Sequence, residues 1–567
     1  MVYRSGSNQA EFARLAEGIL RQRFVRACVY EVVFAYVVAA VGNMDVRRGV
    51  FGVAHALVSG RTAGHAAALY AVGVAALAVH GRLFAVERTA AGGAFRRVQR
   101  VLRRPADSAV AVCAYVAMSW FLTCVHGWMF GGGAARMWLY PEGSYGARQL
   151  NPAWVATWAL ATAVGASYGV QLVADERLQL AFPGVEQRRV YALKDRVAGA
   201  VARGAGFAAG VVWRFWAVYA VCGWAAYRAA SAVAAGLGAG ATRGLDVASP
   251  LLSARAVAFW LASATLTAVT WELAHRLFEV VATEPTHISS LSADRNACLL
   301  GGLRHADSAL VQHLAFHELY RLATFGAAQR AELLADIDRS SGPMWAHVSA
   351  QCIAQLRASM APAATQPKPA GSAPAAPAAP AAGGAPVSDI LKMKSRARAD
   401  APPQAKPDPA PLLGPEPQGL EKYVLSALRD ALLLSPVGQR LLVRAPHAHA
   451  TAALANFQQQ VWAVRALMRL VECSLDEDPY GVVQNDIALV LATLFAYLAE
   501  LERCAAAAQP AAAHASCQPA SRQALAMIHV VRNALYSFTT TFYDYLDALK
   551  LPHELARQLQ PFANFCA

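Results

Sequence analysis

The stretch Thr270–Pro285, TWELAHRLFEVVATEP, comes nearest to a chemical site by residue type and spacing. Four polar residues would share one face of a helix at about 100° per residue: Glu272, His275, Arg276 and Glu279. A carboxylate and an imidazole so spaced can hold a metal, but a di-metal bundle site needs two Glu-x-x-His helices and two further carboxylates. The second such motif, at 284–287, is broken by Pro285. We therefore interpret the stripe as the water-facing or partner-facing cytoplasmic end of a last membrane span.

Two ionisable residues interrupt long apolar segments, Glu31 and Arg214. A charge at the centre of a bilayer costs about 3 kcal/mol even on insertion scales, so such residues are either functional or paired. One interpretation is a transporter or channel that uses both residues for ions or substrate. The other is a structural role, either as a Glu–Arg pair inside a helix bundle or as positions at the membrane interface rather than its centre. We favour a structural role, because the segments show no internal repeat and no matching Gly/Pro interruptions.

Enzyme motifs are missing from the sequence. It contains no P-loop, G-x-S-x-G, H-E-x-x-H or dinucleotide fingerprint, and its ten cysteines form no C-x-x-C pair. We predict no catalytic residue, no cofactor, no metal and no small-molecule substrate, and hence no enzyme. The basic connections have few aromatic residues for base stacking, so we also expect no direct binding of nucleic acid.

The composition is that of a membrane protein over part of its length. Of 567 residues, 56% are apolar and only 16% are charged, against roughly 25% charged in soluble domains. The net charge of +14 suits cytoplasmic loops that face anionic lipid. The polar, basic N-terminus lacks a short apolar region with a cleavage site, so we expect no removable signal peptide.

Apolar segments long enough to span a bilayer, about 20 residues, occur only in the first half. We place about six of them, at 25–42, 62–81, 108–131, 152–174, 208–234 and 254–274.

The basic residues between these segments alternate in number. The N-terminal segment and the connections 82–107 and 175–203 hold five, seven and six Lys or Arg, whereas the other three connections hold three, two and two. Because cytoplasmic loops carry the excess of Lys and Arg, this pattern places both termini on the cytoplasmic or nucleoplasmic side.

The predicted fold is all-α: a polytopic membrane protein followed by a soluble α-helical C-terminal region, with no strand-like alternation. Its parts are a cytoplasmic segment 1–24, a six-span domain 25–282, a helical region 283–358, a disordered Ala/Pro-rich linker 359–418 and a helical interaction domain 419–567. In segment 1–24, Phe12, Leu15 and Ile19 would share one helix face. A helix lying on the membrane and a solvated approach to it both remain open.

Several short motifs carry a resemblance to a known family. The main ones are Trp462–Val471, Asp476–Gln484, Tyr536–Phe542 with Tyr545–Ala548, Gly165–Tyr168, Phe182–Pro183, Thr270–Trp271, Val281–Glu284 and Trp345–Leu356. In this order they resemble the transmembrane nucleoporin family named for the nuclear division cycle (Ndc). The resemblance covers most of the chain outside the linker. Gly481-Val-Val-Gln484 and Thr539-Thr-Thr-Phe542 are its most specific elements.

The resemblance implies a multi-pass membrane protein of the nuclear envelope and nuclear pore complex. In the family such proteins support pore assembly and anchor the scaffold by binding other nucleoporins, including the β-propeller nucleoporin Aladin, the RRM-bearing inner-ring nucleoporin and the inner-ring scaffold. The linker holds no Phe-Gly repeats, so no direct role in the permeability barrier is implied.

Two segments are candidates for contact with such partners. The first is Tyr480, Gly481, Val482, Val483 and Gln484, and the second is Thr539, Thr540, Thr541 and Phe542. The alternative for both is internal packing, with Val482 and Val483 buried.

Overall fold

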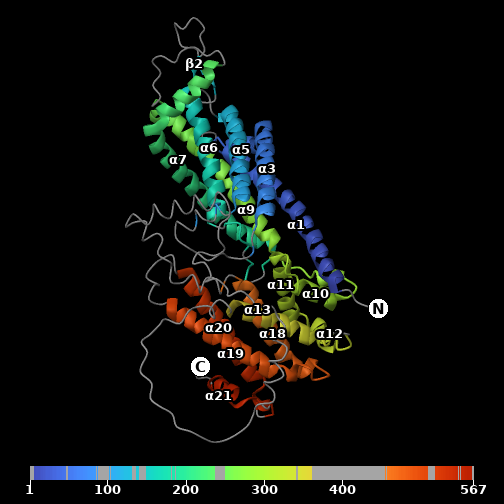
Figure 1. Cartoon of the computed structure of the whole chain (residues 1–567). Coiled ribbons are helices and arrows are strands. Elements are labelled where there is room, and N and C mark those ends of the chain that lie inside the picture. Colours follow the sequence, from blue (N-terminus) through green and yellow to red (C-terminus); the bar gives the residue numbers. More distant parts are fainter. Residues whose placement is uncertain are drawn as a thin grey trace, which may run out of the picture. The chain divides into compact units, whose positions relative to one another are not determined.

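The described part of the chain is almost entirely helical in a computed structural model, which confirms the all-α prediction (Figure 1). The structure describes residues 5–45, 49–84, 86, 97, 101–102, 104–130, 136–139, 149–175, 177–180, 182–184, 187–236, 249–339, 342–360, 454, 456–508, 518–546, 548–549 and 551–564. Within these ranges one pair of two-residue strands occurs, β1 (Trp138–Leu139) and β2 (Gln149–Leu150), paired antiparallel.

Five helices are long and apolar enough to cross a membrane. They are α1 (Ser5–Gly42), α3 (Gly60–Leu83), α5 (Pro105–Phe130), α7 (Arg189–Gly236) and α9 (Ala254–Ala282). Each coincides with one of the predicted spans, but α1 and α7 begin well before theirs, and α5 ends one residue before the predicted 131. Two short helices, α2 (Gly49–Val58) and α8 (Ser249–Leu252), precede α3 and α9.

The remaining predicted span, 152–174, coincides with α6 (Pro152–Ala174). This helix has 23 residues and no charged side chain, but it is not among the five helices counted above as apolar enough to cross a membrane. Its start is encoded locally, since the Asn151 side chain accepts a hydrogen bond from the Ala153 amide at 3.0 Å and Pro152 occupies the first turn.

Close contact between α5 and α6 depends on two glycines of α6. A Cβ added at Gly165 would lie 2.5 Å from the Val116 Cα, and one at Gly169 would lie 2.8 Å from the Val112 Cα. Small residues four apart allow helix backbones in a membrane to approach each other in this way.

α9 is the central helix of this bundle. It contacts α1, α3, α5, α6 and α7, and it is the most buried of the five apolar helices. Trp260 and Trp271 are fully buried along it, and Trp271 packs against the rings of Tyr115 and Tyr168. From Ser263 to Ala282 no residue of α9 is exposed, so side chains on every face of this part of the helix meet protein.

The soluble helices form a second packed region. α10 (Arg295–Leu303), α11 (Ala309–Phe325), α12 (Ala327–Ala335) and α13 (Met344–Met360) precede residues 361–453, and α18 (Phe457–Glu477), α19 (Ile487–Ala508), α20 (Gln518–Thr541) and α21 (His553–Ala563) follow them. Short 3₁₀ turns lie at Ser289–Leu291, Val483–Asn485 and Tyr543–Tyr545.

One hydrophobic core joins both groups of soluble helices. α18 contacts α11, α12 and α13, and α19 contacts α13. Leu314, Trp345, Trp462 and Phe538 belong to the same buried cluster. The two regions that the sequence separates at a linker thus fold together, and we call them the helical domain. Most of the predicted linker, and residues 419–453 of the predicted C-terminal domain, lie outside the described residues.

The N-terminal half of α1 belongs to this core as well. Phe12 is fully buried, and a Cβ added at Gly302 of α10 would lie 2.7 Å from its ring. Leu15 and Ile19 are partly buried against the same cluster. The face that these three residues share is therefore covered by the protein itself, and α1 continues from it into the membrane bundle without a break.

Candidate functional site

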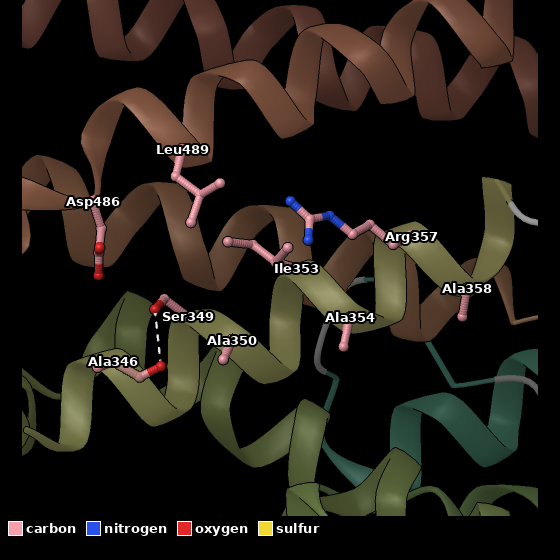
Figure 2. Close-up of a pocket in the computed structure, with 9 residues that line it drawn as sticks. All are labelled: Ala346, Ser349, Ala350, Ile353, Ala354, Arg357, Ala358, Asp486 and Leu489. Atoms are coloured by element: carbon pink, nitrogen blue, oxygen red, sulfur yellow. Dashed lines mark hydrogen bonds between the residues drawn. The ribbon is translucent and has the colours of Figure 1, made fainter. Parts of the chain in front are cut away.

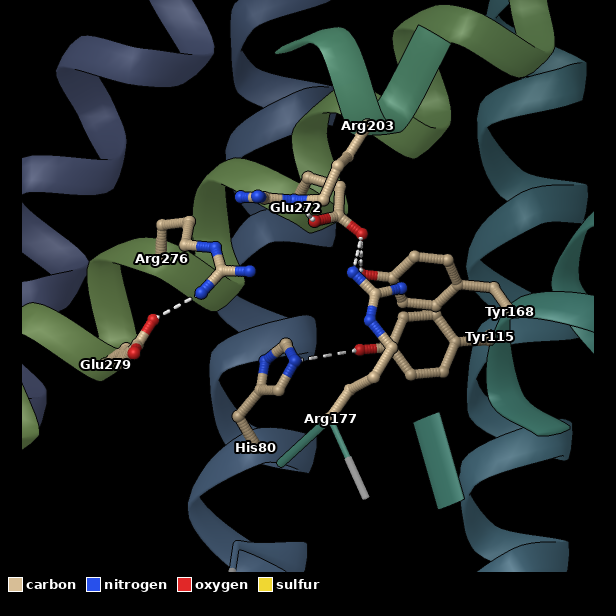
Figure 3. A network of polar contacts seen from close by, with 8 residues as sticks. All are labelled: His80, Tyr115, Tyr168, Arg177, Arg203, Glu272, Arg276 and Glu279. Atoms are coloured by element: carbon tan, nitrogen blue, oxygen red, sulfur yellow. Dashed lines mark hydrogen bonds and ion pairs between the residues drawn. The ribbon is translucent and has the colours of Figure 1, made fainter. Parts of the chain in front are cut away.

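Glu272, predicted to face water or a partner, is buried at 1% exposure in a network of polar contacts (Figure 3). The Tyr168 hydroxyl donates to its Oε1 at 3.2 Å, and the Arg177 guanidinium pairs with the same oxygen. Arg203 of α7 approaches Oε2 at 3.4 Å. The buried carboxylate is thus neutralised by two arginines, and the prediction that Glu272 faces water is wrong.

The rest of the predicted stripe is also enclosed. Glu279 is buried and pairs with Arg276 at 2.6 Å and with Arg196 at 3.3 Å. His275 is buried against His80, with ring centroids 5.0 Å apart. Arg276 alone is partly exposed. Helical periodicity identified the polar face correctly, but packing by α3 and α7 decided that it is internal.

These side chains show no arrangement for metal chemistry. Among the described residues, no group of three or more His, Cys, Asp or Glu is placed to hold an ion. Both carboxylates of the stripe are engaged by arginines, and His80 Nε2 lies 3.4 Å from the Tyr115 hydroxyl. The network's chemistry is structural: it holds α3, α5, α6, α7 and the residues after α6 around α9.

Arg23 of α1 binds the end of α9. Its guanidinium is buried and donates to the Ala282 carbonyl at 2.7 Å, and it also contacts the Glu284 carbonyl and the Thr286 hydroxyl. The last carbonyls of a helix have no partner within it and carry partial negative charge. A cation from α1 satisfies this end of α9. The sequence analysis did not single out Arg23, which lies in the arginine-rich stretch Arg21–Arg26 and is not distinguished there from its neighbours.

Glu284 reinforces the same junction. It pairs with Arg26 of α1 at 2.9 Å and with Arg189 at the start of α7. Three helices therefore converge on the residues that lead from the membrane bundle into the helical domain.

Glu318 of α11 fixes the connection after α9. Its carboxylate accepts from the backbone amides of Ile288 and Ser289 at 3.0 and 2.9 Å and from the Ser289 hydroxyl at 2.6 Å. Burial raises the pKa of this carboxyl, although these hydrogen bonds oppose the shift. The connection is held by one side chain of the helical domain.

Glu31 and Arg214 are not brought together. Glu31 is 1% exposed, lies against Gly73 of α3, and neither of its carboxyl oxygens has a hydrogen-bond partner among the described residues. Arg214 is exposed and donates to the Gly210 carbonyl of its own helix at 2.8 Å. The Glu–Arg pair, one of the two structural alternatives, is therefore wrong, and the two residues do not form one ion or substrate site.

The predicted partner segments are partly exposed. In the first, Tyr480 is 59% exposed and Gln484 is exposed, Gly481 has φ +65°, Val482 is half-buried and Val483 is fully buried. In the second, Thr540 and Thr541 are exposed, whereas Thr539 and Phe542 are buried. The exposed members are free to contact a partner, and the buried ones hold the surface in place.

A groove between α13 and α19 adjoins the first segment (Figure 2). Its volume is about 650 Å³. It is lined by Ala346, Ser349, Ala350, Ile353, Ala354, Arg357, Ala358, Asp486 and Leu489. The alanines at 346, 350, 354 and 358 recur every four residues and leave one face of α13 without large side chains. This spacing was the sequence signal for the groove, and the sequence analysis missed it.

An ion pair joins α12 to the end of α18. Arg330 donates to both carboxyl oxygens of Glu477, at 3.0 and 2.7 Å, and to the Ala323 carbonyl at 3.0 Å. Its side chain is 8% exposed, and the hydrogen bond to Glu477 raises the pKa of Arg330. A bidentate pair of this kind is strong and directional, so it fixes α12 on α18.

Comparison with known proteins agrees with this architecture. The family model "Nucleoporin protein Ndc1-Nup" matches residues 18–560. The chain is 30% identical over 177 residues to Nucleoporin NDC1 of Danio rerio, covering 30% of this chain and 26% of that protein. It is 27% identical over 301 residues to Nucleoporin Ndc1 of Drosophila melanogaster, covering 50% of each chain. Nucleoporin NDC1 of Homo sapiens is 30% identical over 126 residues, covering 21% and 19%.

These matches span half or less of the curated relatives' lengths, but the family model extends over nearly the whole chain. They confirm the resemblance drawn from the sequence motifs, and they identify a family of nucleoporins rather than of enzymes. The chain belongs to the Ndc1 family of transmembrane nucleoporins.

Proposed function

We propose that this nucleoporin anchors the scaffold of the nuclear pore complex to the pore membrane and supports pore assembly. Its apolar helices hold the bilayer, and its helical domain binds other nucleoporins. The partners that we propose are an Aladin-like β-propeller, an RRM-bearing inner-ring nucleoporin and the inner-ring scaffold. Binding alone is sufficient for this role, which requires no reactive group.

The observation that carries the proposal is the rigid connection between membrane bundle and helical domain. α1 is one helix from Ser5 to Gly42, with Phe12 in the core of the helical domain and Ala35 in the core of the bundle. Arg23 and Glu284 bind α1 to the end of α9 between these two points. A force applied to the helical domain would therefore reach the membrane helices through packed structure.

The same packing supports a common side for both chain ends. Because Phe12 and α18–α21 share one core, we place the start of α1 and the C-terminal helices on the same side of the membrane. The excess of basic residues in segment 1–26 supports the cytoplasmic or nucleoplasmic side.

We further propose that partners contact the groove between α13 and α19 together with Tyr480 and Gln484. The alanine face of α13 allows close approach of a helix. Asp486 and Arg357 lie at opposite ends of the groove, which complements the positive N-terminus and negative C-terminus of a docked helix (Figure 2).

Imaging tests the location. The full chain carries a C-terminal fluorescent tag and is viewed by super-resolution microscopy with a stained scaffold nucleoporin. Rim puncta that coincide with pores support the proposal. A diffuse signal in the endoplasmic reticulum or plasma membrane, from a tag shown to be functional, overturns it.

Point variants test the partner surface better than truncation at 418, which would uncover the faces of α11 and α13 that α18 and α19 bury. Ala350→Arg and Ala354→Arg place charge on the exposed alanine face without disturbing the core. We expect loss of co-purified scaffold nucleoporins while the variants remain in the membrane. Ala526→Arg, on an exposed position of α20, is the matched control. Equal co-purification from all variants would exclude the groove.

A further inference from the structure

A second cavity lies where the membrane bundle meets the helical domain. It has a volume of about 360 Å³, within the range of about 300–1,000 Å³ typical of small-molecule sites. Its walls include Leu20 and Phe24 of α1, Ala78 and Gly81 of α3, and Phe278 of α9, and Leu310 of α11 closes it on the soluble side.

The cavity is apolar and chemically unreactive. Arg23 is the one charged residue in its lining, and its guanidinium is already bound by the Ala282 and Glu284 carbonyls and by Thr286. An occupant would therefore meet hydrocarbon walls and no unsatisfied charge. This favours a hydrocarbon chain over a polar metabolite.

One wall of the cavity is exposed on a candidate span. Ala78 of α3 lines the cavity and is exposed, and Val25, Val29 and Val32 of α1, the helix that also supplies Phe24 and Ala27 to the lining, are exposed between 52% and 61%. In a helix from a candidate span, such a surface meets acyl chains. A lipid tail can thus enter from the side without crossing water.

Two basic residues outside the lining are next in sequence to lining residues of α1 and α3. Arg21 follows Leu20 on α1, and Arg82 follows Gly81 in the last turn of α3. Both are exposed. Neither forms an ion pair with a residue in the described ranges. Guanidinium groups at this level match the phosphate of a lipid head group.

We propose that this cavity binds a phospholipid, with one acyl chain between α1 and α3 and an anionic head group on Arg21 and Arg82. A lipid tail gains no hydrophobic transfer energy on leaving the bilayer for an equally apolar cavity. The site therefore selects its lipid through the head group and through filling of a void. The resident lipid would complete the wall between the membrane bundle and the helical domain. This inference does not depend on which partners the helical domain binds.

Photocrosslinking of the full chain tests the site. The protein is reconstituted in phosphatidylcholine vesicles that contain a trace of one probe lipid with a diazirine on its acyl chain. The probe is phosphatidylserine in one experiment and phosphatidylcholine in the other, and the labelled peptides are mapped in both. We expect the phosphatidylserine probe to label residues 20–27, 78–84 and 278–282 more strongly than it labels Trp213, which is exposed on α7 and faces lipid. Equal labelling of the cavity residues and of Trp213 would overturn the proposal. Equal labelling of the cavity by both probe lipids would overturn the proposed binding of an anionic head group by Arg21 and Arg82.

Variants separate a bound lipid from lipid around the protein. Ala78→Phe should fill the cavity from an exposed wall position and abolish its labelling. Ala67→Phe is the matched control, on an exposed position of α3 about 16 Å away along the helix. If Ala78→Phe does not fold, Gly81→Val replaces it, since a Cβ there would meet the Phe278 ring at an ordinary 3.9 Å. Cavity labelling that persists in folded Ala78→Phe or Gly81→Val contradicts the site.

The arginines have their own test. Removing the charge of either arginine, by Arg21→Gln or Arg82→Gln, should weaken the labelling of the cavity by phosphatidylserine about fivefold. Labelling by phosphatidylcholine should not change. If phosphatidylserine labels the cavity equally well in the double variant, head-group recognition by these two arginines is excluded. If a sterol probe labels the cavity in preference to the phospholipid probes, the occupant is a sterol and the phospholipid proposal is overturned.

Discussion

Trp345 donates its indole N–H to the carboxylate of Asp486 across 2.9 Å, joining α13 to the start of α19. The two residues are 141 positions apart and lie on opposite sides of residues 361–453. Trp345 is 1% exposed, so its N–H has left water and depends on this acceptor. The bond fixes the two helices that line the groove.

Replacing the acceptor should loosen the helical domain. In Asp486→Ala the buried N–H of Trp345 loses its partner, at a cost of about 1–3 kcal/mol in the free energy of unfolding. Asp486→Asn retains an oxygen acceptor and should lose less. Thermal unfolding of the full chain in detergent, followed by tryptophan fluorescence, compares the two. Identical unfolding midpoints for Asp486→Ala and the unmodified chain would show that the bond is not formed.

Glu272 should be essential to the membrane bundle. Glu272→Ala leaves Arg177, whose side chain is 19% exposed, without its carboxylate, and we expect destabilisation of about 3–5 kcal/mol. Arg203→Ala removes a side chain that is 46% exposed and should cost only about 0–1 kcal/mol. Unfolding midpoints of the two variants measure the difference. Similar losses from both would place Glu272 in a more solvated setting than the structure shows.

Glu31 should behave in the opposite way. Its carboxyl is buried with no hydrogen-bond partner in the part of the chain that the structure describes, and burying such a group costs about 1–3 kcal/mol in proteins. Glu31→Met, similar in length and apolar, should therefore unfold at a higher temperature and still reach the same membrane. A variant that folds poorly would reveal an unseen partner for the carboxyl. Loss of an ion or solute flux from a folded, correctly located variant would favour the transporter interpretation.

The α5–α6 contact should tolerate no side chain at Gly165. Gly165→Ala places a methyl group 2.5 Å from the Val116 Cα and 2.6 Å from the Tyr115 carbonyl oxygen, which forces the helices apart at about 1–3 kcal/mol. Gly206→Ala, where nothing lies within 4 Å, is the control, and alanine's higher helix propensity should make it neutral or stabilising. Comparable unfolding temperatures would refute the close packing.

The helical domain should lose stability in mild acid. Burial lowers the pKa of His313 and of His317 to about 4 in the folded chain, from an ordinary value near 6.5. The unfolded chain therefore binds more protons as pH falls through 6.5, and stability declines until the folded pKa is reached. At pH 5 each histidine costs about 2 kcal/mol.

His317→Phe should flatten this pH dependence. Phenylalanine keeps a ring against Trp462, whose centroid lies 4.8 Å from that of His317, but binds no proton. Unfolding midpoints of the full chain between about pH 7 and pH 5 provide the comparison. An unchanged slope would mean that His317 is already protonated, or accessible to water, in the folded chain.

Local sequence determined the helices themselves. Apolar length produced the spans, and α6 begins and ends where composition placed it because Asn151 and Pro152 encode its start. The same periodicity grouped Glu272, His275, Arg276 and Glu279 on one face of α9. Motifs in the C-terminal part were sufficient to identify the family.

Tertiary structure alone decided what those faces meet. A helical pattern shows which residues share a face, but not how many neighbours enclose it. Burial of the Glu272 face depends on Arg177 and Arg203, 95 and 69 residues away. The separation of Glu31 from Arg214 depends on how α7 is rotated in the bundle. The shared core across residues 361–453 forms because neither group of soluble helices covers its own apolar faces.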